Sequence, residues 1–300
     1  MRNPRSRQIT ASAMLPCMRI EFLKMQGLGN DFLVFDAATA DTRVDASVLR
    51  ALADRRTGVG FDQALVLETP RDAKSRVYYR IFNADGTEVE QCGNGARCIA
   101  ALLYTRAPQL GRDLVMGSLA GIVHARVRDD GMVSVDMGVP NFDPRSLPME
   151  AAARDAGAQA EAPTYSLKID GVEIEIGAVS MGNPHAVLRV PDVKTAPVER
   201  IGPSIEHHAR FPRRTNVGFM EIVDRGHIRL RVFERGVGET LACGTGACAA
   251  VAVGRRHGLL DEDVRVELKG GTAMVSWLAQ TGHAWLTGPA TTVFSGTVEI

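Results

Sequence analysis

Glu88-Val-Glu-Gln-Cys92-Gly-Asn-Gly-Ala96 recurs 151 residues later as Glu239-Thr-Leu-Ala-Cys243-Gly-Thr-Gly-Ala247, and each copy leads into an alanine-rich apolar stretch. At the same offset, Arg80-Ile-Phe82 matches Arg231-Val-Phe233. A copy of roughly 120 to 150 residues has an ordinary domain size and can bury its own core. Two copies at so long a period indicate a two-domain pseudo-dimer and not a solenoid.

Short strands separated by turn signals make up most of each copy. We expect strands at 18–24, 31–36, 64–68, 76–83 and 122–128, and again at 165–177, 185–190, 217–223 and 227–233. Two helices, at about 94–105 and 245–257, are apolar on every face, which is typical of helices enclosed by protein. The sequence therefore predicts an α+β fold of two pseudo-symmetric domains, each a curved, mostly antiparallel sheet or barrel wrapped around a central apolar helix.

Composition excludes several classes of function. The chain has 35 basic and 35 acidic residues and only 5% aromatic residues, so we expect no nucleic-acid partner. No apolar run approaches the roughly 18 residues that span a bilayer, so we expect no membrane partner. Residues 1–17 are basic, with an apolar segment too short for a secretory signal, and are predicted to be a disordered extension or to precede a true start at Met18. Residues 151–163 indicate a surface helix or loose insertion.

Five cysteines, an odd number, do not form a small secreted disulfide framework, which indicates a reducing, cytoplasmic location. Their spacings are not those of a zinc site and no histidine cluster accompanies them, so we expect no metal. Cys17, Cys98 and Cys248 are interpreted as small buried hydrophobic residues. The repeat, the flanking glycines and the helix-start position favour catalysis for Cys92 and Cys243.

A cysteine at a helix start lies beside unpaired backbone N–H groups and the positive end of the helix dipole, which favours the thiolate. The same N–H groups can hold a carboxylate and stabilise the charge that develops when a Cα–H is deprotonated. Two equivalent thiols can remove a proton from one face of a carbon and return one to the other. This chemistry needs no cofactor, and no lysine stands in an obvious pyridoxal-phosphate setting. A dithiol redox pair is the alternative.

The chain resembles the diaminopimelate epimerase family from about residue 18 to residue 300. The motifs that carry the resemblance are Lys24-Met-Gln-Gly-Leu-Gly-Asn30-Asp31-Phe32, Gly60-Phe-Asp-Gln63, Phe82-Asn83-Ala-Asp-Gly86, Gln91-Cys92-Gly-Asn-Gly-Ala-Arg-Cys98, Gly182-Asn-Pro-His185, Thr215-Asn216 and Glu234-Arg-Gly-Val-Gly-Glu-Thr-Leu-Ala-Cys-Gly-Thr-Gly246. The resemblance implies a homodimeric, cofactor-independent isomerase that interconverts LL- and meso-diaminopimelate for lysine and peptidoglycan synthesis. It also implies a first domain of residues 18–136 completed by a returning strand at 289–300, and a second domain of residues 137–288.

The resemblance also implies roles for individual residues. Cys92 would be the base toward the LL substrate and Cys243 the acid. Proton relay or support would come from His185, Glu234 and Asp31. The residues implied to bind substrate are Asn30, Gln63, Asn83, Gly93, Asn94, Asn183, Asn216, Glu234, Arg235, Gly244 and Thr245.

Two alternatives remain from the sequence alone. A proline racemase-like isomerase acting on another amino acid would share the two thiols, but a substrate without a distal head needs no receptor such as Glu234-Arg235. A binding or redox protein of the same fold would not exchange the α-proton of a substrate. Departures from the family pattern, the extension at 1–17 and Gly218 after Thr-Asn-Val, do not touch the proposed chemistry.

Overall fold

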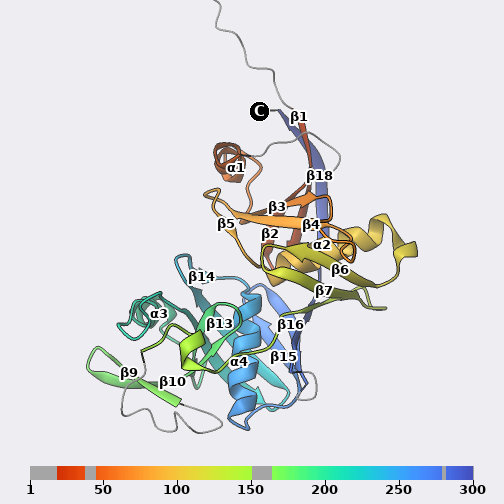
Figure 1. The fold of residues 1–300 in the computed structure, drawn as a ribbon. Helices are drawn as coiled ribbons and strands as arrows, with labels where there is room; N and C mark the ends of the chain where they lie inside the picture. Colours follow the sequence, from red (N-terminus) through yellow and green to blue (C-terminus); the bar gives the residue numbers. More distant parts are fainter. Residues whose placement is uncertain (1–18, 38–44, 151–163, 279–281, 300) are drawn as a thin grey trace, which may run out of the picture.

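The computed structural model describes residues 19–37, 45–150, 164–278 and 282–299 (Figure 1). The predictions for the extension at 1–17 and the insertion at 151–163 therefore lie outside the described residues. Within the described residues, no helix combines the length and the apolar character needed to cross a bilayer.

The chain forms two halves with the same order of elements. The first half contains β1 (Arg19–Gly27), β2 (Asn30–Asp36), α1 (Ala46–Ala53), β3 (Gln63–Glu68), β4 (Tyr78–Asn83), β5 (Glu88–Val89), α2 (Gly93–Arg106), η1 (Pro108–Leu110), β6 (Asp113–Ser118), β7 (Gly121–Val127) and β8 (Val133–Asp136). After η2 (Pro144–Ser146), the second half contains β9 (Thr164–Ile169), β10 (Val172–Ser180), β11 (Pro184–Arg189), α3 (Val198–Glu206), β12 (Asn216–Asp224), β13 (His227–Glu234), β14 (Gly238–Thr240), α4 (Gly244–Arg256), β15 (Asp263–Leu268), β16 (Gly271–Trp277) and β17 (Ala284–Gly288). The last strand is β18 (Thr291–Glu299).

Strand pairing repeats between the halves. Most pairs are antiparallel, and the parallel pairs occur at equivalent places, β2 with β3 and β4 with β6 in the first half, β11 with β12 and β13 with β15 in the second. β8 pairs antiparallel with β17 and so joins the two halves into one continuous sheet. The α+β class and the pseudo-symmetric arrangement predicted from the sequence are confirmed.

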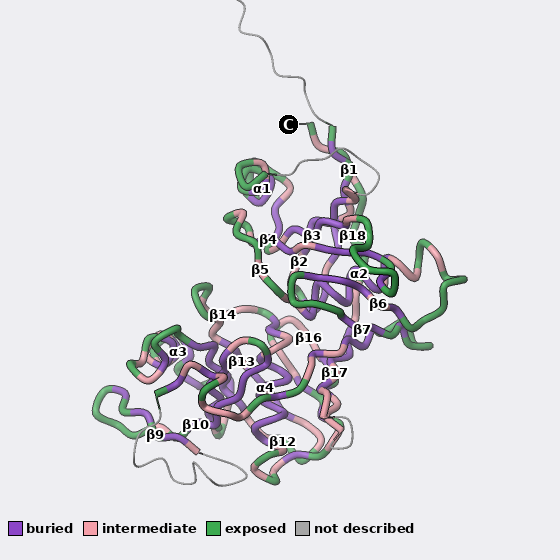
Figure 2. Tube along the Cα trace, in the orientation of Figure 1, coloured by how far each residue is buried: buried purple, intermediate pink, exposed green. Residues whose placement is uncertain are grey.

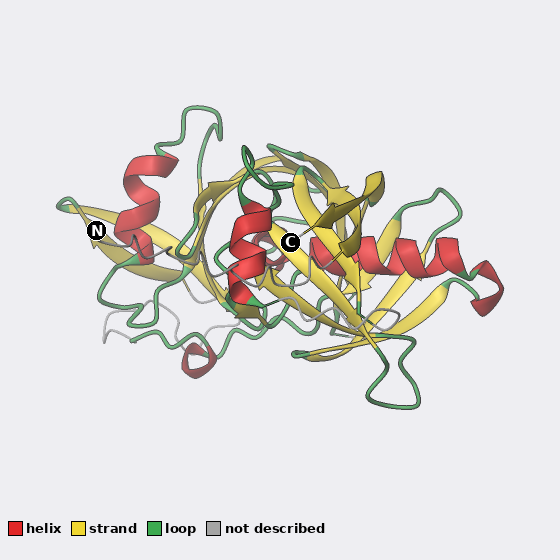
Figure 3. Ribbon diagram, turned by 90° about the horizontal axis from the view of Figure 1, so that it is seen from above, coloured by secondary structure: helices red, strands yellow, loops and turns green. Residues whose placement is uncertain are grey.

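The two apolar helices lie inside the curved sheets, as predicted. α2 and α4 are buried along most of their length, and they share one large apolar core with strands of both halves (Figure 2). Two smaller cores lie under α1 and under α3. Seen from above, the strands curve around the helices (Figure 3).

One predicted strand is wrong in extent. The segment 165–177 is a hairpin of β9 and β10, turning at Asp170 and Gly171, whose φ angles are 52° and 82°. An Asp-Gly pair with positive φ at both residues makes the tight turn that matches strand twist. The structure also has two helices, α1 and α3, that are not expected from the sequence. In α3, Gly202 and Pro203 weaken the helical pattern.

The last strand returns to the beginning of the chain. β18 pairs antiparallel with β1 along nearly its whole length, and no other strand pairs with it among the described residues. In the second half, β9 occupies the corresponding place beside β10. In the second half, this partner of β10 is thus the preceding strand of the same hairpin, whereas in the first half the corresponding partner of β1 is the distant strand β18.

Candidate active site

Cys92 and Cys243 are the N-cap residues of α2 and α4. Their backbones are extended, and each sulfur accepts a hydrogen bond from a glycine N–H of its helix, Gly95 N at 3.5 Å and Gly246 N at 3.4 Å. An N-cap side chain that accepts such a bond satisfies one of the unpaired donors of the first turn. The repeated peptide therefore places both thiols in the same local geometry.

The two helix starts face each other across the junction of the halves. A Cβ on Gly244 would lie 3.9 Å from the Cα of Gly93 and only 2.8 Å from Cδ2 of Leu286. Asn94 Nδ2 donates to the carbonyl oxygen of Ala242 in the other half, at 3.1 Å. The structure thus brings the two predicted catalytic segments into one site.

Around Cys92, three side chains form a linked set. The Cys92 thiol donates to Asn30 Oδ1 at 3.7 Å, and Asn94 Nδ2 donates to the same oxygen at 3.3 Å. Asn30 Nδ2 in turn donates to Asp62 Oδ2 at 2.9 Å. Because an ionised carboxylate only accepts hydrogen bonds, Asp62 fixes the amide of Asn30 with its oxygen toward Cys92.

Asp31, for which relay or support is expected from the sequence, is held by two cationic side chains. Its carboxylate accepts hydrogen bonds from Lys24 Nζ at 2.6 Å and from both terminal nitrogens of Arg55 at 2.9 and 2.7 Å. Burial raises the pKa of Asp31, but the bonds from Arg55 and Lys24 outweigh it and bring the pKa well below its ordinary value. A group that stays ionised in this way does not carry protons at neutral pH.

Around Cys243, the neighbouring ionisable side chain is Glu234; burial and the charge of Glu234 both raise the pKa of the thiol. The Glu234 carboxylate accepts a hydrogen bond from Thr240 Oγ1 at 2.5 Å. Cys243 Sγ lies 3.5 Å from Thr245 Oγ1. Burial raises the pKa of Glu234, so this carboxyl group can hold a proton more readily than an exposed one.

His185 is buried beside the second helix start, with 1% of its surface exposed. Its Nε2 lies 3.1 Å from Asn183 Oδ1, while Asn183 Nδ2 donates to Thr245 Oγ1 at 3.4 Å. Nε2 therefore carries the hydrogen and Nδ1 is the free acceptor, with no partner among the described residues. Burial, with the nearby positive charge of Arg235, lowers the pKa of His185 to about 3, so the ring is neutral.

The amides predicted to bind substrate fall into two groups. Gln63 Nε2 donates to Asn83 Oδ1 at 3.0 Å, which leaves the buried Gln63 Oε1 without a partner among the described residues. In contrast, both polar atoms of Asn216 are occupied, since Nδ2 donates to Pro184 O at 3.0 Å and Oδ1 accepts from Arg235 N at 3.0 Å. Asn216 thereby holds the turn that carries Glu234 and Arg235.

Arg235 is exposed, and its guanidinium reaches the carbonyl oxygen of Arg213 at 3.3 Å. The adjacent Gly236 N donates to Glu206 Oε1 at 2.8 Å, and Glu206 is 3% exposed. The turn is therefore held by a buried carboxylate as well as by an amide. Its arginine keeps a side chain that solvent and small molecules can reach.

The expectation that the helix starts favour thiolates is wrong for the unliganded site. Burial raises the pKa of Cys92 to about 11, against smaller opposing contributions from the N–H groups of Gly95 and Asn94. Burial and the charge of Glu234 raise the pKa of Cys243 well above its ordinary value. Removal of the thiols from water outweighs the helix-start donors, so both are protonated at neutral pH.

Three supporting residues are absent from the sequence-based selection. Asp62 lies inside the motif Gly60-Phe-Asp-Gln63, and this motif is the sequence signal that could have identified it. Thr240 lies within the repeated peptide itself. Glu206 comes from a different element, α3, and no local pattern connects it with the turn it holds.

A pair of thiols, one from each half of a pseudo-symmetric fold and both at the start of a buried helix, defines the class of two-cysteine racemases and epimerases. Solved structures with this fold include a hydroxyproline epimerase from Agrobacterium vitis with bound trans-4-hydroxy-L-proline, with a TM-score of 0.66, 16% identity, and coverage of 94% of this chain and 93% of that one. A PhzF-family phenazine biosynthesis protein from Bacillus anthracis gives a TM-score of 0.64 at 17% identity, with coverage of 94% and 100%.

Sequence comparison defines the family within this class. The family model described as diaminopimelate epimerase matches residues 22–142 and 177–293. A diaminopimelate epimerase from Thioalkalivibrio sulfidiphilus is 54% identical over 285 residues, covering 94% of this chain and 100% of the relative, and one from Nitrosomonas europaea is 51% identical over 283 residues with the same coverage. The chain belongs to the diaminopimelate epimerase family, as the motifs predicted.

Proposed function

We propose that this protein epimerises LL-2,6-diaminopimelate to meso-diaminopimelate, without a cofactor, in lysine and peptidoglycan precursor synthesis. The observation that carries the proposal is the pair of thiols at facing helix starts, one from each half. A carbon held between them has a proton acceptor on one face and a donor on the other. The family membership supports the substrate.

In this scheme Cys92, as a thiolate, removes the α-proton of the LL centre, and the Cys243 thiol gives its proton to the opposite face. The reaction leaves Cys92 as a thiol and Cys243 as a thiolate, so one proton must return from Cys92 to Cys243 before the next turnover. Backbone N–H groups of Gly93, Asn94, Gly244 and Thr245 hold the reacting carboxylate and stabilise the developing negative charge.

Because both thiols are protonated in the unliganded site, the thiolate forms when substrate binds. Enclosing the substrate's ammonium group beside a thiol favours the thiolate, since an opposite charge lowers a pKa. Glu234, whose charge acts on both thiols and whose raised pKa lets it hold a proton, is our proposed relay. We propose that the neutral His185, with a free acceptor at Nδ1, supports the site.

The distal amino-acid head of the substrate needs both acceptors and a cation. Gln63 Oε1 is a buried acceptor without a partner among the described residues, and such an atom costs free energy until a ligand donates to it. Arg235 supplies a charge partner for the distal carboxylate. We propose that Asn30, Asn83, Asn183 and Asn216 complete this pocket, Asn216 acting through the turn it holds.

Solvent proton exchange tests the function. The reduced protein is incubated with LL-diaminopimelate in D₂O, and the α-proton signal and the stereoisomer ratio are followed. We expect deuterium at the α-carbon together with the meso isomer, and loss of epimerisation in Cys92→Ala and Cys243→Ala with the fold retained. Exchange only with proline or another amino acid would favour the proline racemase-like alternative, and no exchange with any amino acid would favour a binding or redox protein.

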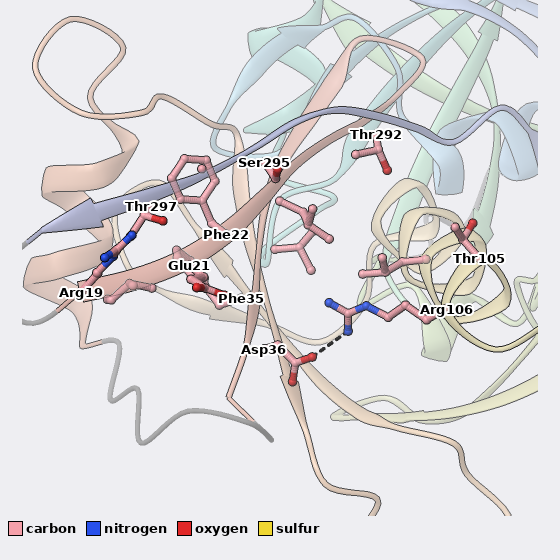
Figure 4. A pocket seen from close by; sticks show the side chains of 15 residues that line it. Arg19, Glu21, Phe22, Phe35, Asp36, Thr105, Arg106, Thr292, Ser295 and Thr297 are labelled. Atoms are coloured by element: carbon pink, nitrogen blue, oxygen red, sulfur yellow. Dashed lines mark hydrogen bonds and ion pairs between the residues drawn. The ribbon is translucent and has the colours of Figure 1, made fainter.

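We further propose that the protein is a homodimer that associates through β18. Among the described residues only β1 pairs with this nine-residue strand, which exposes Val293 (56%) and Phe294 (46%). On the same part of the sheet, a groove of about 1160 Å³ runs between β1, β18 and the end of α2, where Phe22 and Arg106 are labelled in Figure 4. Exposed apolar strand edges are templates for pairing with another chain.

Light scattering during gel filtration measures this association. We expect the wild-type protein to elute with the mass of two chains, and Phe294→Glu to elute as one. A wild-type monomer, or a Phe294→Glu dimer, would count against β18 as the interface.

We propose the domain boundaries given by the sequence, 18–136 with 289–300 and 137–288, which the pairing of β18 with β1 supports. A cytoplasmic location is proposed because Cys92, Cys98, Cys243 and Cys248 are free thiols and the chemistry needs reduced cysteines.

A further inference from the structure

Among the buried positions at which the two apolar helices differ, one carries a charged residue in α2 only. Five residues after Cys92, α2 carries Arg97, whereas five residues after Cys243, α4 carries Cys248. Arg97 is fully enclosed, with 0% of its surface exposed, and is among the largest fully buried side chains of the protein. The repeat is therefore symmetric in its thiols and asymmetric in its buried charge.

The guanidinium of Arg97 lies in a slot lined by backbone. Its Nε donates to the carbonyl oxygen of Pro289, in the connection from β17 to β18, at 3.4 Å. A Cβ on Gly27 would lie 3.2 Å from Nη2, and a Cβ on Gly288 would lie 3.2 Å from Cζ. Gly27 pairs with Asn30 at the end of the β1–β2 hairpin. The guanidinium therefore lies close to the hairpin that carries Asn30, the hydrogen-bond partner of the Cys92 thiol.

This cation has no carboxylate partner. Within the described part of the chain, Nη1 and Nη2 find no hydrogen-bond acceptor and Arg97 forms no ion pair. Burial lowers the pKa of Arg97, and the ionisable groups that oppose this effect are the thiols of Cys98, Cys92 and Cys248. Burying an unpaired charge costs several kcal/mol, as an order of magnitude, so an apolar residue of similar size would be more stable here.

Of the three thiols, only Cys92 reaches the site. Cys98 and Cys248 are 0% exposed, and burial raises the pKa of each to about 12, so they remain neutral. Cys92 is partly exposed and caps α2 at the junction of the halves. A fixed positive charge on α2 therefore acts on one thiol that has to ionise during the proposed reaction.

We propose that Arg97 is a positioning residue that stabilises the Cys92 thiolate electrostatically and leaves the Cys243 thiolate without equivalent help. The charged and titratable groups that face Cys92 are Arg97 from α2, Glu234 from β13 and Tyr79 from β4. Glu234 disfavours both thiolates, and Arg97 opposes it at Cys92.

The consequence for turnover is a preferred resting arrangement. After Cys92 has taken the proton from the LL centre and Cys243 has given one up, Arg97 favours return of the proton from Cys92 to Cys243. The enzyme is thereby reset for the next LL substrate. This inference rests on the proposed function only in giving the two thiols opposite catalytic roles.

Alkylation by iodoacetamide tests the proposal without any substrate. The reduced full-length wild type, Arg97→Gln, Arg97→Met and Arg97→Lys are alkylated across a range of pH, and each cysteine is followed separately by peptide mass spectrometry. The thiolate is the reacting form, so the rate reports its population. We expect loss of the charge in Arg97→Gln and Arg97→Met to move the Cys92 profile up by about one pH unit, a roughly tenfold slower reaction at a given pH below the midpoint.

Cys243 is the control within the same samples, because it caps α4, which carries no arginine at the position equivalent to Arg97. We expect its profile to stay in place in every variant, and Arg97→Lys to keep the Cys92 profile nearer to wild type. Gln retains a donor toward Pro289 O, which guards against loss of the fold, and circular dichroism and thermal melting check each variant.

Three outcomes would overturn the proposal. An unchanged Cys92 profile in a folded neutral variant would make Arg97 a brace for the β17–β18 connection only. Equal shifts at Cys92 and Cys243 would indicate general loosening, and an Arg97→Lys protein that matches Arg97→Gln would exclude the charge as the cause. A selective Cys92 shift in a protein that does not epimerise diaminopimelate would sustain the role of Arg97 and refute the proposed function.

Discussion

Gly244→Ala tests how closely the two helix starts have to approach. The added Cβ would lie 2.8 Å from Leu286 Cδ2, and since carbon atoms pack at about 3.5 to 4.0 Å, one of the two must move by about 1 Å. Overpacking of this kind costs about 1 to 3 kcal/mol of stability. A displacement of about 1 Å at a reacting centre can lower the rate about 100-fold.

We therefore expect Gly244→Ala to remain folded but to lose epimerase activity by one to two orders of magnitude. Leu286→Val removes the clashing atom and by itself costs about 1 kcal/mol, the value of one buried methylene. In the double variant we expect activity to recover at least tenfold over Gly244→Ala, because residues in contact do not act additively.

The assay is the initial rate of meso isomer formation for wild type, both single variants and the double variant, with unfolding in urea measured in parallel. Gly226→Ala is the matched control, because a Cβ there meets nothing closer than 3.6 Å and we expect no change. Activity of Gly244→Ala within twofold of wild type would refute the close-approach argument. Failure of Leu286→Val to restore any activity would refute the identification of the clash.

Three further predictions concern residues that support the site. Glu206→Ala leaves Gly236 N without its acceptor, so we expect KM for diaminopimelate to rise several-fold with a smaller change in kcat. Glu206→Gln should restore KM to near the wild-type value. A change in kcat alone would contradict the role of Glu206 in holding the turn. Because the folded pKa of His185 is about 3 and the unfolded value is near 6.5, protons bind the unfolded chain preferentially as pH falls from 6.5 toward 3. At pH 5 this lowers the free energy of unfolding of the wild type by about 2 kcal/mol. Urea titrations at pH 7 and pH 5 should therefore show that His185→Gln loses about 2 kcal/mol less free energy of unfolding than wild type. Equal losses in the two proteins would count against a neutral ring. Asp62→Ala frees the amide of Asn30 to rotate, and we expect about a tenfold loss of kcat with unchanged melting temperature, whereas full activity would show that the amide needs no such anchor.

The repeat made the architecture predictable, because Cys92 and Cys243 mark the same point in two copies of one fold. It also placed both buried helices to within two residues of α2 and α4. Local sequence patterns did not predict the contacts that form between different helices, strands and turns. Glu206 holds Gly236 from another helix, and the pairing of Asp31 with Arg55 depends on a turn 24 residues away.

The protonation state of the thiols shows a different limit. Sequence gives the helix starts, and with them the donors that favour a thiolate, but it does not give the degree of desolvation. In the folded protein that opposing effect is larger at both Cys92 and Cys243. Competing effects of opposite sign at one atom are resolved only when the surroundings are known.

The pairing of β1 with β18 imposes an order of events on synthesis. Residues 19–27 leave the ribosome early, but their partner, residues 291–299, is translated after all the other described strands. The second half, with its edge supplied locally by β9, has all its strands through β17 before that point. During translation the second half can therefore complete its sheet first, while β1 is paired with β2 on one edge and its other edge stays open until β18 is made. Loss of residues 291–299 would leave that edge of β1 permanently exposed to other chains.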